Sequence, residues 1–455
     1  MRHVAVMSLS ASVGLVSIFL VDLVDLLFIA LLDDPALTAA VGYAATLLYF
    51  TFAVTLGMNI ACSALAARMI GQGDDDEARK VATSAIGFGI GVSVVIGGTV
   101  WLAAPTLLGW LGADGRTAEA ASSYIRIILP AMPIATFGMM CGGLLRAHGD
   151  ARRAMTVTLT AGAVNAILDP IFIFVLDLGL EGAAMASVCA RIATAITALV
   201  PVVRHYGGFS RFSLSRLRLD LSPILGITVP AVLTNVATPV GGSIIVRAMS
   251  QFGDSAVAGY AVIGRLTPLA FCVIFALSGA VGPIIGQNFG AGQFDRVRGT
   301  LSKAMMFASA YTLLAWGLLM VLYGPIADWF KLSGEGRDLV FWYAAAVAPL
   351  FIFNGSLFIS NAAFNNLKRP LWSTMLNWGK NTIGVAPFVV VGAHLGGAPG
   401  VLISQSVGGI LFGVIGLWLA YRLVTGFENG TVDPNTSWRP SLMRNRAEPH
   451  FPSRQ

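Results

Sequence analysis

Charged residues are scarce in this sequence. Asp, Glu, Lys and Arg make up 11% of its 455 residues, whereas a soluble domain carries about 25%. Hydrophobic residues make up 56%, and the mean hydropathy is +0.76. This composition excludes an ordinary soluble domain and indicates that most of the chain lies in a membrane.

Motifs of enzymatic chemistry are also missing. The four cysteines, Cys62, Cys141, Cys189 and Cys272, have no metal or redox spacing and fall inside apolar runs, so we expect small core residues. The five histidines form no cluster, and there is no phosphate-binding loop and no GxSxG motif. We therefore expect a protein that is not an enzyme and that has no cofactor.

Long apolar runs take the place of these motifs. A helix needs about 20 residues to cross a bilayer core, and lipid-exposed spans must be helical because lipid offers no partner to a free backbone group. The first run contains Asp22 and Asp25 and is too long for a secretory signal, so we interpret it as an uncleaved span. Twelve runs are long enough, with approximate ranges 5–32, 39–70, 81–111, 119–147, 154–176, 182–203, 222–250, 255–288, 299–325, 337–366, 369–393 and 400–424.

Lysine and arginine concentrate in alternate loops. The loops on the side of the N-terminus hold 21 of them, and the opposite loops hold three, Arg116, Lys331 and Arg337. The positive-inside rule therefore predicts that both termini are cytoplasmic, with the chain in an inner (plasma) membrane. The net charge of +6 follows from this topology and does not indicate nucleic-acid binding. The basic segment 204–221 is expected to be a cytoplasmic linker that touches anionic lipid.

One segment of the chain occurs twice. Residues 67–80 (ARMIGQGDDDEARK) correspond to residues 286–299 (GQNFGAGQFDRVRG) at an offset of 219, which aligns Gly71 with Gly290. Each half contains six predicted spans. An even number of spans gives the two halves the same orientation, so they are related by an axis near the membrane normal.

The sequence therefore predicts an all-α polytopic membrane protein. Twelve transmembrane helices form two pseudo-symmetric six-helix lobes around a central cavity, as in secondary transporters built from parallel repeats. The predicted parts are an N-lobe at 1–203, a linker at 204–221, a C-lobe at 222–424 and a disordered cytoplasmic tail at 425–455.

Three acidic residues fall well inside spans: Asp22, Asp25 and Asp169. A carboxylate near the bilayer centre costs at least about 2.5–3.5 kcal/mol, so each should face water, bind a cation or carry a proton. Asp22 and Asp25 share one helix face, and Asn165 and Asp169 share another, because they are three and four residues apart. Oxygen ligands from Asn165, Asp169 and Ser187 suit Na⁺, whereas clustered carboxylates favour a shared proton.

The spans of the C-half differ from those of the N-half in the charged residues that they contain. No acidic residue lies well inside the spans of the C-half, and Lys380 is their deepest basic residue, which could hold a carbonyl cluster or repel a cation. Apolar walls with few polar groups favour bulky amphipathic solutes. Four polar residues are candidates for the wall of the substrate cavity: Asn235, Thr238, Asn354 and Asn361.

Several of these segments resemble the multidrug and toxic compound extrusion (MATE) transporters. GPIIGQNFGAGQFDRVR (282–298) resembles the loop after that family's eighth span, and ALAARMIGQGDDDEARKVA (64–82) resembles the loop after its second. NAILDPIFIF (165–174) with GAAMAS (182–187) resembles its fifth and sixth spans. The resemblance implies cation-coupled export of organic, often cationic, compounds.

The resemblance also implies where the coupling cation binds. Asp25 matches the acidic residue of the first span, Asn165 and Asp169 match the N-x-x-x-D pair of the fifth, and Ser187 stands where a threonine is common. Some sodium-coupled members carry a glutamate in the seventh span, where this chain has Thr238. H⁺ is therefore favoured over Na⁺, and Asp25, Asn165 and Asp169 would be the metal ligands if Na⁺ binds.

The expected partners are small organic substrates and membrane lipids, with no nucleic acid and no ATPase partner, and the expected state is a monomer. A flippase for lipid-linked sugars is a first alternative, but it would need a basic cavity for a pyrophosphate. A membrane-embedded transferase is a second, but it would need an acid, base or metal cluster at one membrane face. Three intramembrane acids and few basic residues in the N-half argue against the first, and no such cluster supports the second.

Overall fold

The structure, a computed structural model, describes residues 35–434 except Lys331 and Ser333, together with positions 12–14, 16, 17, 19, 21 and 28. Asp22 and Asp25, with most of the predicted first span, lie outside the described residues, as does the segment after residue 434. Every regular element of the described chain is a helix, as the apolar runs predict.

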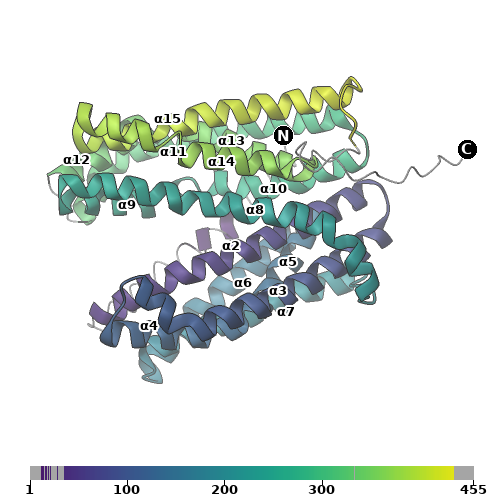
Figure 1. The fold of residues 1–455 in the computed structure, drawn as a ribbon, viewed down its shortest axis with the longest axis horizontal. Coiled ribbons are helices and arrows are strands. Elements are labelled where there is room, and N and C mark those ends of the chain that lie inside the picture. The colour runs from purple at the N-terminus through teal and green to yellow at the C-terminus, as the bar shows by residue number, and fades with distance from the viewer. Residues whose placement is uncertain are drawn as a thin grey trace, which may run out of the picture.

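The N-lobe is formed by helices α2 to α7 (Figure 1). The short helix η1 joins α4 to α5 without a break, so that Gly115–Ala147 makes one span. A π-helix, η2, extends α6. The elements are α2 (Pro35–Gly71), α3 (Asp75–Trp110), α4 (Gly115–Ile128), η1 (Leu129–Ala131), α5 (Met132–Ala147), α6 (Ala151–Pro170), η2 (Ile171–Val175) and α7 (Gly179–His205).

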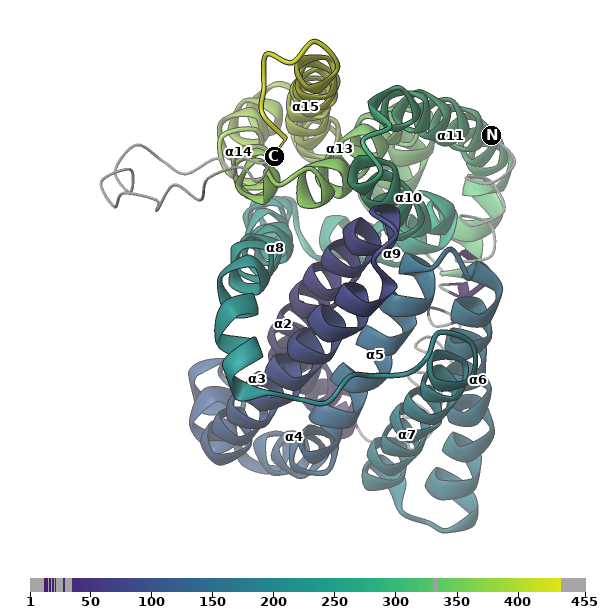
Figure 2. The ribbon, with the colours of Figure 1, turned by 90° about the vertical axis from the view of Figure 1, so that its right-hand side faces the viewer.

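The C-lobe is formed by helices α8 to α15, and it lies beside the N-lobe in both views (Figures 1 and 2). Segment 206–213 joins the lobes and runs across the end of the N-lobe from α7 to α8 (Figure 2). The elements are α8 (Leu214–Met249), η3 (Ser250–Phe252), α9 (Asp254–Ala270), α10 (Cys272–Gly290), α11 (Phe294–Trp329), α12 (Glu335–Trp342), η4 (Tyr343–Val347), α13 (Phe351–Asn366), α14 (Pro370–Asn381) and α15 (Ala386–Glu428).

In the described part of the chain, nine helical segments are long and apolar enough to cross a membrane. The number is ten if the pair α12–α13, bent by 63°, makes one span. The continuous segment Pro370–Glu428 contains the last two predicted spans, with non-helical backbone between them at Gly396 and Gly397. The last helix continues to Glu428, four residues past the predicted end of the C-lobe at residue 424.

The helix boundaries repeat at the offset that the sequence predicts. Helix α2 begins at Pro35 and ends at Gly71, and the pair α9–α10 begins 219 residues later at Asp254 and ends 219 residues later at Gly290. Helices α3 and α11 are related by the same offset at both ends. The two halves therefore share their secondary structure as well as a motif.

The lobes touch where α2 crosses α10. A Cβ atom added to Gly71 would lie 2.0 Å from the carbonyl oxygen of Gln287, and one added to Gly290 would lie 2.1 Å from that of Arg68. Arg68 and Gln287 are themselves 219 residues apart, so these are one contact made twice across the pseudo-twofold axis. Glycine is required here because the two helix backbones are in contact.

Two hydrogen bonds reinforce this crossing. Arg68 Nη2 on α2 donates to the carbonyl oxygen of Asn365 on α13 at 2.9 Å. Gln287 Nε2 on α10 donates to the carbonyl oxygen of Ala147 at the end of α5, at 2.7 Å. Each lobe therefore binds the end of a helix of the other, on the side that carries the Lys- and Arg-rich loops.

The cysteines lie in the packing, as predicted. Cys62, Cys141 and Cys272 are buried, Cys189 is half-buried, and all four are free thiols. Cys62 and Cys141 belong to the N-lobe core, where small side chains allow the helices to approach closely.

We predict that Gly71→Ala and Gly290→Ala destabilise the protein to a similar extent. The added methyl group would overlap backbone atoms of the other lobe, and overpacking of this kind costs about 1–3 kcal/mol. The matched control is Gly91→Ala on α3, where no atom lies within 4 Å of the new Cβ. Thermal unfolding of the purified protein in detergent should show a lower midpoint for the first two variants alone. Equal midpoints in all three would contradict the close crossing.

Candidate functional site

Helix α6 begins at a hydrogen-bonded cap. The Asp150 carboxylate accepts a hydrogen bond from the backbone N–H of Arg153 at 3.2 Å and one from the Tyr206 hydroxyl at 2.8 Å. Burial raises the pKa of Asp150, but the hydrogen bonds from Tyr206 and Arg153 outweigh this effect and hold the pKa below its usual value. An ionised Asp150 at the N-terminus stabilises the helix that carries the candidate site.

Helix α6 ends at a break. Pro170 cannot donate a backbone hydrogen bond, so the regular α-helical pattern cannot continue through it. The chain changes to the π-helix Ile171–Val175 directly afterwards. Short π-helical turns occur often at functional sites. Asp169 is the residue immediately before this break.

The structure brings Asn165 and Asp169 together. Asn165 Nδ2 donates to Asp169 Oδ2 at 2.7 Å, as expected for residues four apart on a helix. The side chain of Asp169 is 0% exposed and that of Asn165 is 9% exposed. A carboxyl group this deeply buried must be stabilised by a proton, a cation or polar partners.

The other N-lobe candidates are placed less fully. Ser187 is half-buried on α7, which packs along α6. Asp22 and Asp25 lie outside the described residues, so their predicted role in the cation site stays a prediction. The described part of the predicted site is therefore the hydrogen-bonded pair Asn165–Asp169 on α6, with Ser187 on the neighbouring helix α7.

Two of the predicted cavity residues lie on α8. The Asn235 side chain donates back to the Ala231 carbonyl at 2.8 Å, while the Asn235 carbonyl accepts from the Tyr49 hydroxyl of α2 at 3.3 Å. Asn235 is therefore a contact between the lobes. Thr238, three residues further on, is exposed.

The other two predicted cavity residues lie on α13 and contact α14. Asn361 is 8% exposed, and its Oδ1 accepts from Asn377 Nδ2 at 3.0 Å, so it is part of the packing within the C-lobe. Asn354 Oδ1 accepts from Lys380 Nζ at 2.5 Å. This second pair gives Lys380 a neutral partner that the sequence did not reveal.

Lys380 is a charged residue within the spans of the C-lobe, as Asp169 is within those of the N-lobe. It lies in the last turn of α14, half-buried, and the sequence has no Asp or Glu between positions 339 and 427. The repeat does not preserve either charge: position 161, equivalent to Lys380, is alanine, and position 388, equivalent to Asp169, is phenylalanine. The two lobes share a fold, but neither Asp169 nor Lys380 has a charged counterpart in the other lobe.

Comparison with known proteins identifies the class as an integral membrane transporter. The MatE family model matches residues 11–171 and 230–391, one match in each half of the chain. The chain belongs to the MatE family, the transporters that its sequence motifs resemble.

Similar proteins agree with this assignment. The FAD transporter of Shewanella oneidensis is 25% identical over 94% of this chain and 96% of its own. The multidrug export protein MepA of Staphylococcus aureus is 21% identical over 91% of this chain and 92% of its own. Both relatives match along nearly their whole length, so the similarity extends over both lobes.

Solved structures show the same fold. A mutant of the Vibrio cholerae MATE transporter VcmN superposes with a TM-score of 0.88 at 24% identity, over 92% of this chain and 96% of that one. A MOP superfamily transporter from Pyrococcus furiosus, described as having a binding pocket of reverse polarity, superposes with a TM-score of 0.87 at 22% identity over 94% and 96%. The twelve-helix, two-lobe architecture predicted from the sequence is confirmed.

We predict that Asp169→Asn abolishes gradient-driven efflux while leaving the protein folded. The amide has nearly the same shape, but it neither binds a proton near neutral pH nor supplies charge to a cation. Efflux of a fluorescent substrate from proteoliposomes under an imposed gradient should fall to the rate of empty liposomes. Asp177→Asn is the control, because Asp177 is exposed in the next loop and its backbone φ of 52° suits asparagine. Wild-type efflux by the Asp169 variant would exclude the site.

Proposed function

We propose that this protein is a secondary transporter that exports small organic compounds in exchange for a cation, with H⁺ favoured over Na⁺. The observation that carries the proposal is the buried pair Asn165–Asp169 at the break between α6 and η2. Burying a carboxyl group there is costly, and the cost is explained if the group takes up and releases a cation during each cycle.

Exchange follows from competition for one negative charge. When a proton or Na⁺ occupies Asp169, the charge is compensated and a cationic substrate loses its attraction to the N-lobe. When the ion leaves, the charge returns and favours the substrate. If the coupling ion and the substrate bind best to different conformations of the lobes, they shift the equilibrium between these conformations in opposite directions. This opposition couples their movements.

The finer parts of the proposal come from the sequence and from the relatives. Substrates are amphipathic organic compounds, cationic in the main case, in keeping with the similarity to a multidrug export protein. In this proposal the transporter acts as a monomer in the inner membrane. Both termini lie in the cytoplasm, which the distribution of Lys and Arg supports. The ion gradient supplies the energy, so no ATPase partner is needed.

The coupling ion is tested by separating the two gradients. We predict that proteoliposomes transport a cationic dye under an imposed proton gradient in Na⁺-free buffer. A Na⁺ gradient at fixed and equal pH should produce little transport. The reason is that no carboxylate lies well inside the C-lobe spans, where it could complete a second cation site. Transport that requires Na⁺ and ignores the proton gradient would refute the choice of H⁺ but keep the Asp169 site.

A second candidate function is favoured by Lys380. Its ammonium group is half-buried and its hydrogen-bond partner, Asn354, is neutral, so an anionic group of a substrate would be a stronger partner. The relative that transports FAD carries a substrate of this kind. In this case the N-lobe handles the coupling cation, and the C-lobe binds a phosphate or carboxylate of the substrate.

The two substrate classes are distinguished by Lys380→Gln. If anionic substrates bind at this residue, FAD transport should fall about ten- to hundredfold, because a hydrogen bond to a charged group contributes about 1.5–3 kcal/mol. Transport of a cationic dye should persist, and Lys380→Arg should restore much of the FAD transport. No FAD transport by the wild-type protein, or equal losses for both substrates in Lys380→Gln, would refute the second candidate.

A further inference from the structure

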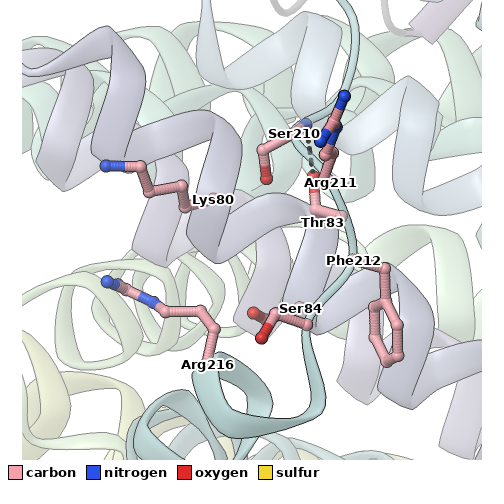
Figure 3. Close-up of a pocket in the computed structure, with 8 residues that line it drawn as sticks. Lys80, Thr83, Ser84, Ser210, Arg211, Phe212 and Arg216 are labelled. Carbon is pink, nitrogen blue, oxygen red and sulfur yellow. Dashed lines mark hydrogen bonds between the residues drawn. The ribbon is translucent and has the colours of Figure 1, made fainter.

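A basic pocket lies where the linker joins the two lobes (Figure 3). Its volume is about 310 Å³. The first turns of α3 supply one wall, the linker supplies the second, and the start of α8 supplies the third. The pocket is therefore built from both lobes, and it is separate from Asp169 and from Lys380.

The lining of this linker pocket is suited to an anion. Three of its eight residues are the cations Lys80, Arg211 and Arg216, four carry hydroxyl groups, and none is acidic. The charged ends of Lys80 and Arg216 extend to the same side of the pocket, and the Ser210 side chain lies between them and the linker backbone (Figure 3). Arg211 points away from this pair and adds positive charge nearby.

The acidic neighbours compensate these cations only in part. Arg216 pairs with Glu77 and, at 2.9 Å, with Asp220, and so the start of α8 is bound to α3 across the lobe boundary. Lys80 Nζ is 3.8 Å from Glu77, beyond hydrogen-bond distance, and half of its side chain is exposed. The Lys80 ammonium group therefore keeps donors for a ligand.

The linker is held in place at the pocket. Thr83 Oγ1 accepts from the backbone N–H of Ser210 at 3.0 Å and donates to the Arg79 carbonyl at 2.7 Å. Phe212, two residues further on, lies against α3, where a Cβ atom on Gly87 would be 2.4 Å from its ring. These contacts fix the backbone that forms one wall of the pocket.

The depth of the pocket matches the lipid headgroups. Helix α3 has 36 residues and is about 54 Å long, whereas the hydrocarbon core is about 30 Å thick. About 12 Å of helix then extends beyond the core at each end if it is centred. Lys80 lies five residues after Asp75, about 7.5 Å along the helix, which is within the headgroup region. Phe212 contacts Gly87, deeper along the same helix, and is 55% exposed to the surroundings.

We propose that the linker pocket binds the phosphate of an anionic phospholipid headgroup. Lys80 and Arg216 hold the phosphate oxygens, the hydroxyl groups of the linker complete the site, and Phe212 lies beside the first part of the acyl chains. The bound lipid joins α3 of the N-lobe to α8 of the C-lobe, next to the Arg216–Glu77 pair. This site does not depend on which compound is transported.

The test is a titration of purified protein in neutral detergent with short-chain phosphatidylglycerol, followed by thermal unfolding. We expect phosphatidylglycerol to raise the unfolding midpoint in a saturable way, and phosphatidylcholine to have little effect. Lys80→Glu should weaken the apparent affinity for phosphatidylglycerol about thirtyfold, since one charge near a lipid surface contributes about 1 kcal/mol and this variant changes two. Lys80→Arg should bind like the wild type.

Lys303→Glu is the matched control, because Lys303 is exposed on α11 of the other lobe and undergoes the same charge reversal. Its affinity for phosphatidylglycerol should stay within about twofold of wild type. A parallel titration adds inorganic phosphate at the same concentrations, alone and together with the lipid. Equal weakening in both Glu variants, equal stabilisation by phosphatidylcholine, or displacement of the lipid by equimolar phosphate would overturn the proposal.

Discussion

The crossing of α2 and α10 is the constraint on which the arrangement of the lobes depends. At Gly71 and Gly290 the backbones of the two lobes are in contact, and the hydrogen bonds of Arg68 and Gln287 hold helix ends of the opposite lobe beside them. A contact that is repeated by symmetry fixes both lobes at one end. Relative movement of the lobes must break or slide this contact, so its strength sets how readily the transporter changes conformation.

The duplicated fold carries different chemistry in its two halves. The N-lobe buries Asp169 at a helix break, and the C-lobe partly buries Lys380 near the end of α14, with neither charge present at the equivalent position of the other half. A shared architecture explains how the lobes pack, but it does not determine what each binds. In the second candidate function, the N-lobe carries the coupling ion and the C-lobe contributes to the choice of substrate.

Much of the fold could be predicted from the sequence because its signals are local or repeated. Apolar runs predict the spans, the offset of 219 predicts matching helix ends, and the four-residue spacing predicts the Asn165–Asp169 hydrogen bond. The contacts Arg68–Asn365 and Lys380–Asn354 join residues 297 and 26 positions apart, so no local pattern reveals them. The role of Asn361 could not be predicted for the same reason, because its hydrogen bond with Asn377 depends on how α13 packs against α14.

The central claim is that substrate and coupling ion exchange at one buried carboxyl group. Its most direct test is proton release on substrate binding, measured with purified protein in weakly buffered, Na⁺-free detergent solution. Addition of a transported cationic dye should release about one proton per dye molecule bound, since ligand and proton binding are linked. The release should disappear at a pH high enough to remove the proton beforehand. Dye binding with no proton release at any pH would contradict the account.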